Sequence, residues 1–164
     1  MPPPVPPKLS EPDLCDPAFW LYLSVAAEHI LQNELRAAVR ERRDNGVAEQ
    51  DLWNELFRLG LKTVDAHAQR LQMEAFVDFA TTAAGGSSTG VGLLLVLHAI
   101  RVVEQDSAWY VANKLLSFDQ LKQFGDLMDA LSDRLFPLAP ALIEEFGLDD
   151  LLQVPILDPA LIKR

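Results

Sequence analysis

The sequence predicts an all-α protein, an up-and-down bundle of four long helices with short helical pieces. Apolar residues recur at spacings of three and four along most of the chain, which is the period of an amphipathic helix. Strict alternation of apolar and polar residues, which is typical of a β-strand, does not occur. The 164 residues are 49% hydrophobic and 23% charged, which fits one globular domain.

The first long helix is expected over about residues 17–43. Asp16 lies directly before a proline, and this pair is typical of a helix N-cap followed by the first helical residue. Asn45 and Gly46 supply a left-handed stop at the other end. The proline-rich residues 1–12 predict an extended, disordered arm before this helix.

The second long helix is expected over about residues 49–81, with a dry face and a wet face. The stripe expected to face the core contains Trp53, Leu56, Gly60, Val64, Leu71, Ala75 and Phe79. The opposite stripe, expected in solvent, contains Glu55, Arg58, Lys62, Asp65, Gln69 and Gln72. Small residues near the dry side would let another helix approach closely; they are Gly60, Ala68 and Ala75.

Residues 85–90, a run of glycine, serine and threonine, are the clearest break in the chain and predict a connection. The alternative is an anion site at the start of the next helix, although the run lacks the lysine of a P-loop. Residues 91–100 are apolar on every side except at His98, which predicts a helix at the centre of the bundle. We expect His98 to be a core histidine with satisfied hydrogen bonds.

The remaining elements are expected to be shorter or interrupted. Residues 107–113 predict a short turn or helix, and Ser117 with Gln120 matches a capping box. The helix that follows carries apolar residues at alternating spacings of three and four. Pro137 and Pro140 should bend it or restart it.

Charge and length limit the function. The expected organisation is a disordered arm over residues 1–12, a helical domain over 13–156 and a tail over 157–164. The formal charge of −10 argues against binding to nucleic acid or anionic lipid. No apolar run reaches the ~18 residues of a membrane span. The lone Cys15 permits no intramolecular disulfide, and the start lacks the order of a signal peptide, so we expect a cytoplasmic protein.

The residues alone predict no catalytic residue and no metal site, and cofactor-binding residues stay unknown. His29, His67 and His98 are too few and too scattered for a metal motif. Cys15 lies beside a carboxylate, which disfavours its thiolate. The adjacent pair Glu144 and Glu145 points to different sides of a helix, so we expect it to be solvated surface.

Several short segments nevertheless follow one another in the order in which similar segments occur in a known protein family. They are 104–110 (EQDSAWY), 115–117 (LLS), 142–148 (LIEEFGL) and 151–156 (LLQVPI). This order resembles the C-terminal helical region of acyl-CoA oxidases, especially the bacterial type. The Ala66-His67 step followed by Phe76, and the segment 13–19, also fit, so the resemblance spans about residues 13–156.

The resemblance implies a helical bundle that belongs to a flavoenzyme. Members of the family oxidise acyl-CoA to the trans-2-enoyl thioester, with a glutamate as base and FAD as hydride acceptor. In the family, the catalytic glutamate and the flavin-contacting domain lie upstream of the region that is matched here, so no residue is assigned to either role. The resemblance therefore implies a detached domain or small subunit that binds no cofactor alone and completes a flavoprotein chain carrying FAD.

The alternative is a non-catalytic helical interaction module, with self-association as a further outcome. In either case a detached bundle should expose an apolar face, because large exposed apolar patches usually mark interfaces. The candidate interface residues are His67, Trp109, Tyr110, Phe124 and Phe136.

Overall fold

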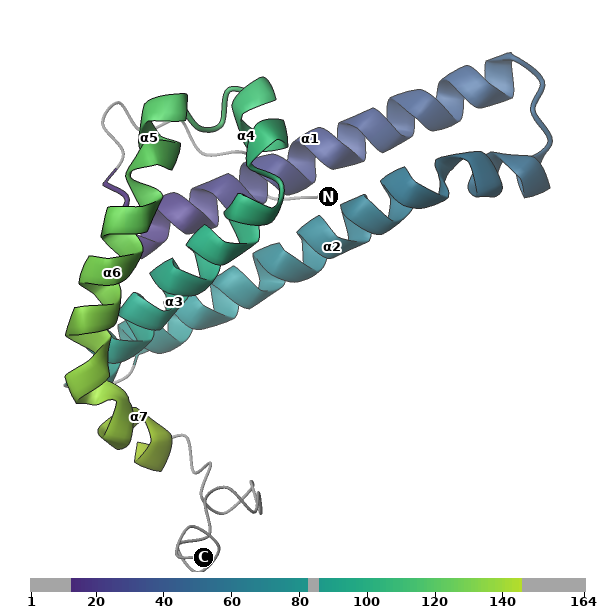
Figure 1. Cartoon of the computed structure of the whole chain (residues 1–164). Coiled ribbons are helices and arrows are strands. Elements are labelled where there is room, and N and C mark those ends of the chain that lie inside the picture. Colours follow the sequence, from purple (N-terminus) through teal and green to yellow (C-terminus); the bar gives the residue numbers. More distant parts are fainter. Residues whose placement is uncertain (1–12, 83–85, 146–164) are drawn as a thin grey trace, which may run out of the picture.

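The computed structural model describes residues 13–82 and 86–145, and this part of the chain is all-α, as predicted (Figure 1). The side chains of residues 86–88 and 145 are outside the description, as are the expected arm, the tail and residues 146–156. The longer helices are α1 (Pro17–Asp44), α2 (Glu49–Thr82), α3 (Gly86–Gln105) and α6 (Phe124–Leu135). The short ones are α4 (Ser107–Ala112), α5 (Phe118–Lys122), η1 (Phe136–Leu138) and α7 (Ala139–Glu145).

Helices α1 and α2 form a long antiparallel hairpin. The Asp16 side chain accepts a hydrogen bond of 2.9 Å from the backbone N–H of Ala18, so the predicted N-cap is confirmed. Gly46 has a φ of +75°, which confirms the left-handed stop. Figure 1 shows that the connected ends of α1 and α2 project well beyond α3 and α4.

Helix α3 is the centre of the fold, as its apolar sequence predicts. It packs against α1, α2, α6 and α7, and Leu95 and Ile100 are fully buried. The predicted core position of His98 is wrong: this side chain is only partly buried, and its Nε2 lies 3.1 Å from Oε1 of Gln72 on α2. The imidazole therefore lies at the edge of the core, where a polar partner and solvent are both within reach.

The glycine-rich run is mostly helix rather than a connection, which corrects the prediction. Helix α3 already begins at Gly86, so Thr89 and Gly90 lie inside its first turns. A Cβ atom at Gly90 would lie 2.8 Å from Cδ1 of Leu142 on α7. The close approach of α7 thus explains the glycine at this position. Because Thr89 lies inside the helix, its backbone does not form the free helix N-terminus that the alternative anion site requires.

The second half of the chain packs against α3 through α4, α6 and α7. The predicted capping box is present at α5, where Ser117 Oγ accepts from the Gln120 N–H and Gln120 Oε1 accepts from the Ser117 N–H. The expected single helix is divided further, because α5 ends at Lys122 and α6 starts at Phe124. The prolines act as predicted: Pro137 lies in the 3₁₀ turn, and the chain restarts as α7.

Trp20 on α1 connects the two halves of the core. It is 1% exposed, its ring centroid lies 5.8 Å from that of Phe124, and its Nε1–H donates a 2.8 Å hydrogen bond to the carbonyl of Leu14. A buried indole needs such a partner for its N–H. Trp20, Phe124 and the α3 residues Leu95 and Ile100 belong to one buried cluster, so α1, α3 and α6 share a core.

Candidate protein interface on helix α2

Helix α2 has two apolar faces, one of which is buried against the rest of the molecule while the other is largely exposed. The buried face consists of Leu52, Leu56, Thr63, Ala66, Arg70 and Met73. The other face carries large exposed side chains, with fractional exposures of 64% at Val64, 62% at Phe57 and 56% at Trp53. We call this second face the α2 stripe and define it as Trp53, Phe57, Leu61, Val64, Ala68, Leu71, Ala75 and Phe79, all of which are exposed.

The predicted dry face of α2 is therefore wrong for most of its residues. Leu56 is buried, but Trp53, Val64, Leu71 and Phe79 are exposed, Phe79 the least of the four at 39%. Both faces repeat every three or four residues, and this spacing predicts an apolar stripe without saying which side it faces. The prediction missed Phe57 and Leu61, which lie between Trp53 and Val64 on the exposed face.

A buried cluster of charged and polar groups sets the rotation of α2. Glu28 on α1 is 2% exposed, and its Oε2 accepts a hydrogen bond from Nε of Arg70. Its Oε1 accepts from Nδ1 of His67 and from Nε2 of Gln32, each at 2.8 Å. The Arg70 Nη1 reaches Oε1 of Glu74 at 2.5 Å, so the guanidinium bridges two carboxylates.

This cluster keeps Glu28 ionised. Burial raises the pKa of the Glu28 carboxyl, but the hydrogen bonds from His67 and Arg70 and their charges outweigh burial and lower the pKa overall. A rotation of α2 that buried the stripe would remove Arg70 from Glu28 and leave an unpaired charge in the core. That loss is strongly destabilising, so the cluster favours the rotation that leaves the stripe in solvent.

A half-polar cleft of about 520 Å³ lies beside the stripe, between α1, α2, α3 and α4. Lys62 Nζ forms an ion pair with Asp106 and lies 4.8 Å from the centroid of the Trp109 ring. Burial, with a smaller contribution from the charge of Asp106, raises the pKa of Tyr110 to about 12. The tyrosine is therefore neutral at ordinary pH, and Lys62 and Asp106 neutralise each other. Arg58 and Asp65 also line the cleft, and both are exposed.

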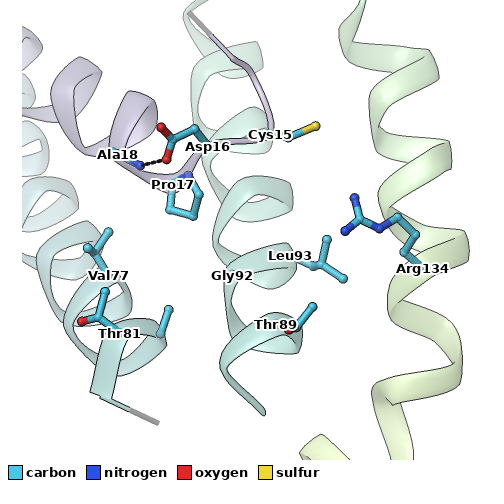
Figure 2. A pocket seen from close by; sticks show the side chains of 11 residues that line it. Cys15, Asp16, Pro17, Ala18, Val77, Thr81, Thr89, Gly92, Leu93 and Arg134 are labelled. Carbon is cyan, nitrogen blue, oxygen red and sulfur yellow. Dashed lines mark hydrogen bonds between the residues drawn. The ribbon is translucent and has the colours of Figure 1, made fainter. Parts of the chain in front are cut away.

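A more apolar cleft of about 410 Å³ lies between the starts of α1 and α3, the end of α2 and α6. Figure 2 shows Cys15 and Arg134 on the side of this cleft toward α6, with Thr81 and Val77 on the opposite side. The Asp16 carboxylate there is used by the N-cap of α1. The cleft thus brings together a thiol and a guanidinium, with no base hydrogen-bonded to the thiol among the described residues.

The structure disperses the predicted interface residues. Phe136 is 83% exposed and the His67 side chain 51%, so these two side chains are accessible. Trp109 is partly buried, while Tyr110 and Phe124 are core residues at 6% and 2% exposure. Of the five, His67 alone lies on α2, where its Nδ1 is already bound to Glu28.

Two further types of site are not seen in the described part of the chain. Residues 13–82 and 86–145 contain no cluster of three histidine, cysteine or carboxylate side chains that would hold a metal ion. Within the same ranges, no helix has the length and apolar character needed to cross a membrane.

No family model, curated protein or solved structure matches this chain. The acyl-CoA oxidase resemblance therefore rests on the order of its sequence motifs and stays a prediction. The candidate site is instead supported by the exposed apolar surface of α2.

Proposed function

We propose that this protein is a helical interaction module that acts by binding another protein chain through the α2 stripe. The observation that carries the proposal is the row of large apolar side chains left in solvent along α2, from Trp53 to Phe79. Isolated exposed apolar residues are ordinary, but a continuous row is typical of an interface.

The size of the row supports this proposal. Aromatic side chains bury about 150–250 Å² each, and the exposed fractions of Trp53 and Phe57 exceed one half. Together with the aliphatic members, the stripe offers roughly 500 Å² of apolar area, the size of a patch that is often functional. The connected ends of α1 and α2 project beyond α3 and α4, so the start of α2, which carries Trp53 and Phe57, extends past these helices (Figure 1).

The polar groups of the described residues favour binding over catalysis by this chain alone. Glu28 has Arg70, His67 and Gln32 as partners, so its carboxylate is occupied and buried. Lys62 and Asp106 are paired with each other in the half-polar cleft. A general base needs a free position facing substrate; Glu28 and Asp106 offer none, and Asp65, which also lines the cleft, is exposed to solvent.

The resemblance adds a specific partner to this proposal, a flavoprotein chain of the acyl-CoA oxidase type that carries FAD. The test is co-expression with a neighbouring flavoprotein gene, followed by measurement of acyl-thioester-dependent flavin reduction with and without this chain. Activity that needs this chain supports the flavoprotein partner. Equal activity in its absence contradicts that partner and leaves the general interaction module.

The general proposal is tested in the organism's own cells with the full-length, tagged chain. After chemical cross-linking, we expect the wild-type chain in complexes larger than one copy. Val64→Asp should shift it to the monomer mass, because a charge would enter the apolar contact. Phe118→Asp is the matched control, since Phe118 is 65% exposed against 64% for Val64 but lies on α5. A wild-type chain found only as free monomer would contradict the proposal.

A further inference from the structure

We infer that the α2 stripe binds the α2 stripe of a second copy in an antiparallel pair of helices; this deepens the proposed function by naming the partner. From Phe57 to Ala75 the spacings alternate four and three. This is the 3.5-residue repeat with which two helices pack along a common seam. The seam positions are Phe57, Leu61, Val64, Ala68, Leu71 and Ala75.

The sizes of the seam residues favour the antiparallel direction. In a parallel pair each seam residue meets its own copy, so Phe57 would face Phe57 while Ala68 would face Ala68 and leave a void. In an antiparallel pair one register places Phe57 against Ala68 and Leu61 against Val64 of the second copy, so the contact is centred on these four residues, and Leu71 and Ala75 lie opposite the polar Asn54 and Gln50. The largest of the four residues then meets the smallest, and two aliphatic residues of middle size meet each other, which fills the centre of the contact more evenly than the parallel pair.

The flanking charges favour the same register. Arg58 and Asp65 border the seam on one side, both are exposed, and neither has an ion-pair partner within the described residues. In the antiparallel register each Arg58 lies beside Asp65 of the other copy, which gives two equivalent ion pairs related by a two-fold axis. In the parallel, in-register pair the flanking neighbours are Trp53 with Arg58 and Gly60 with Asp65, so no opposite charges meet.

The apolar area agrees with a reversible dimer. Two whole stripes offer about 1,000 Å² in total, and this register buries the part of each that runs from Phe57 to Ala68, which is the size of a weak, transient contact. Gly60 lies opposite His67 in this register, so the half-exposed imidazole would have room beside the second helix. The surface can therefore pair with itself without moving the Glu28 cluster.

The test is sedimentation equilibrium of the purified full-length chain over a range of concentrations. We expect a monomer–dimer equilibrium for the wild type and for Phe118→Asp. The exposed substitutions Arg58→Asp and Asp65→Arg should each weaken the dimer about tenfold, because like charges then face each other twice. Circular dichroism checks that each variant keeps its helices.

Two combinations make the test specific for the antiparallel register. The double variant Arg58→Asp with Asp65→Arg restores both opposite-charge pairs and should return to within about threefold of the wild-type affinity. An equimolar mixture of the two single variants should form a heterodimer, because every flanking pair is then attractive. No rescue in either combination would overturn the register.

A monomeric wild-type chain at all concentrations would overturn the second copy as partner. If that chain still forms larger complexes in its own cells that Val64→Asp removes, the interaction module stands and the partner is a different protein. If deletion of residues 146–164 converts a monomer into a dimer, the chain's own C-terminal segment covers the stripe, and the inference also fails.

Discussion

Replacing Arg70 by methionine should destabilise the fold far more than the same change at an exposed arginine. Arg70 is 8% exposed and binds Glu28, which is 2% exposed. Without the guanidinium, the Glu28 carboxylate stays in the core with only His67 and Gln32 as donors. Removing one partner of a buried ion pair costs about 3–5 kcal/mol.

Arg43→Met is the matched control. Arg43 makes a 2.7 Å ion pair with Glu49, but their side chains are 54% and 63% exposed, so solvent replaces the lost contact. We expect a cost below about 1 kcal/mol for this exposed pair. The double change Glu28→Leu with Arg70→Met removes both charges and should recover most of the loss, because an apolar pair can replace a buried ion pair.

The measurement is urea unfolding followed by circular dichroism at pH 7 and at one fixed protein concentration, because dimerisation makes stability depend on concentration. The midpoint should fall at constant slope, and Tm should drop by roughly 6–20 °C for Arg70→Met. An Arg70→Met variant no less stable than Arg43→Met would refute the argument that the buried cluster sets the rotation of α2.

Three further predictions follow from the core, the glycines and the buried carboxylate. Leu95→Asp should prevent folding, because Leu95 is 0% exposed, whereas His98→Gln at the edge of the core should melt cooperatively like the wild type; thermal scans compare the two. A Cβ atom at Gly125 would meet open space, so Gly125→Ala should raise the free energy of unfolding by about 0.5–1 kcal/mol. Gly90→Ala must displace Leu142 and should lower the free energy of unfolding by about 1–3 kcal/mol; urea titrations measure both changes. Because folding lowers the pKa of Glu28 from 4.5, the ionised carboxylate stabilises the fold fully above pH 4.5, and this stabilisation is lost as the pH falls further. In an acid titration, the stability of Glu28→Gln should therefore fall less with decreasing pH than that of the wild type.

Local signals predicted the helix boundaries best. Asp16, Gly46 and the capping box at Ser117 satisfy backbone groups next to them in sequence, and all three are present in the structure. The central place of α3 was also predictable, because Leu95 and its neighbours are apolar all around the helix. The glycine-rich start of α3 was not, since its reason is the contact of Gly90 with Leu142 on α7, which is distant in sequence.

The rotation of α2 depends on a pairing between distant residues. Glu28 and Arg70 are 42 positions apart, and neither looks like a core residue on its own helix. Because the two charges neutralise each other, both side chains can be buried. The face of α2 that carries Arg70 then faces the core, and the α2 stripe on the other side stays in solvent. The aromatic residues Tyr110 and Phe124, which the sequence suggested as interface candidates, belong to the core because they join the buried cluster formed with α1 and α3. A periodic pattern shows that a face is apolar, but its partner is set by tertiary contacts.

Disulfide trapping tests the antiparallel contact of the α2 stripe most directly. In a Cys15→Ser background, Phe57→Cys in one chain and Ala68→Cys in a second, tagged chain should form a mixed disulfide on mild oxidation. Phe57→Cys alone should stay reduced, because the two copies of this position lie roughly 16 Å apart along the antiparallel pair, beyond disulfide reach. Absence of the mixed disulfide, or rapid cross-linking of Phe57→Cys with itself, would contradict the contact.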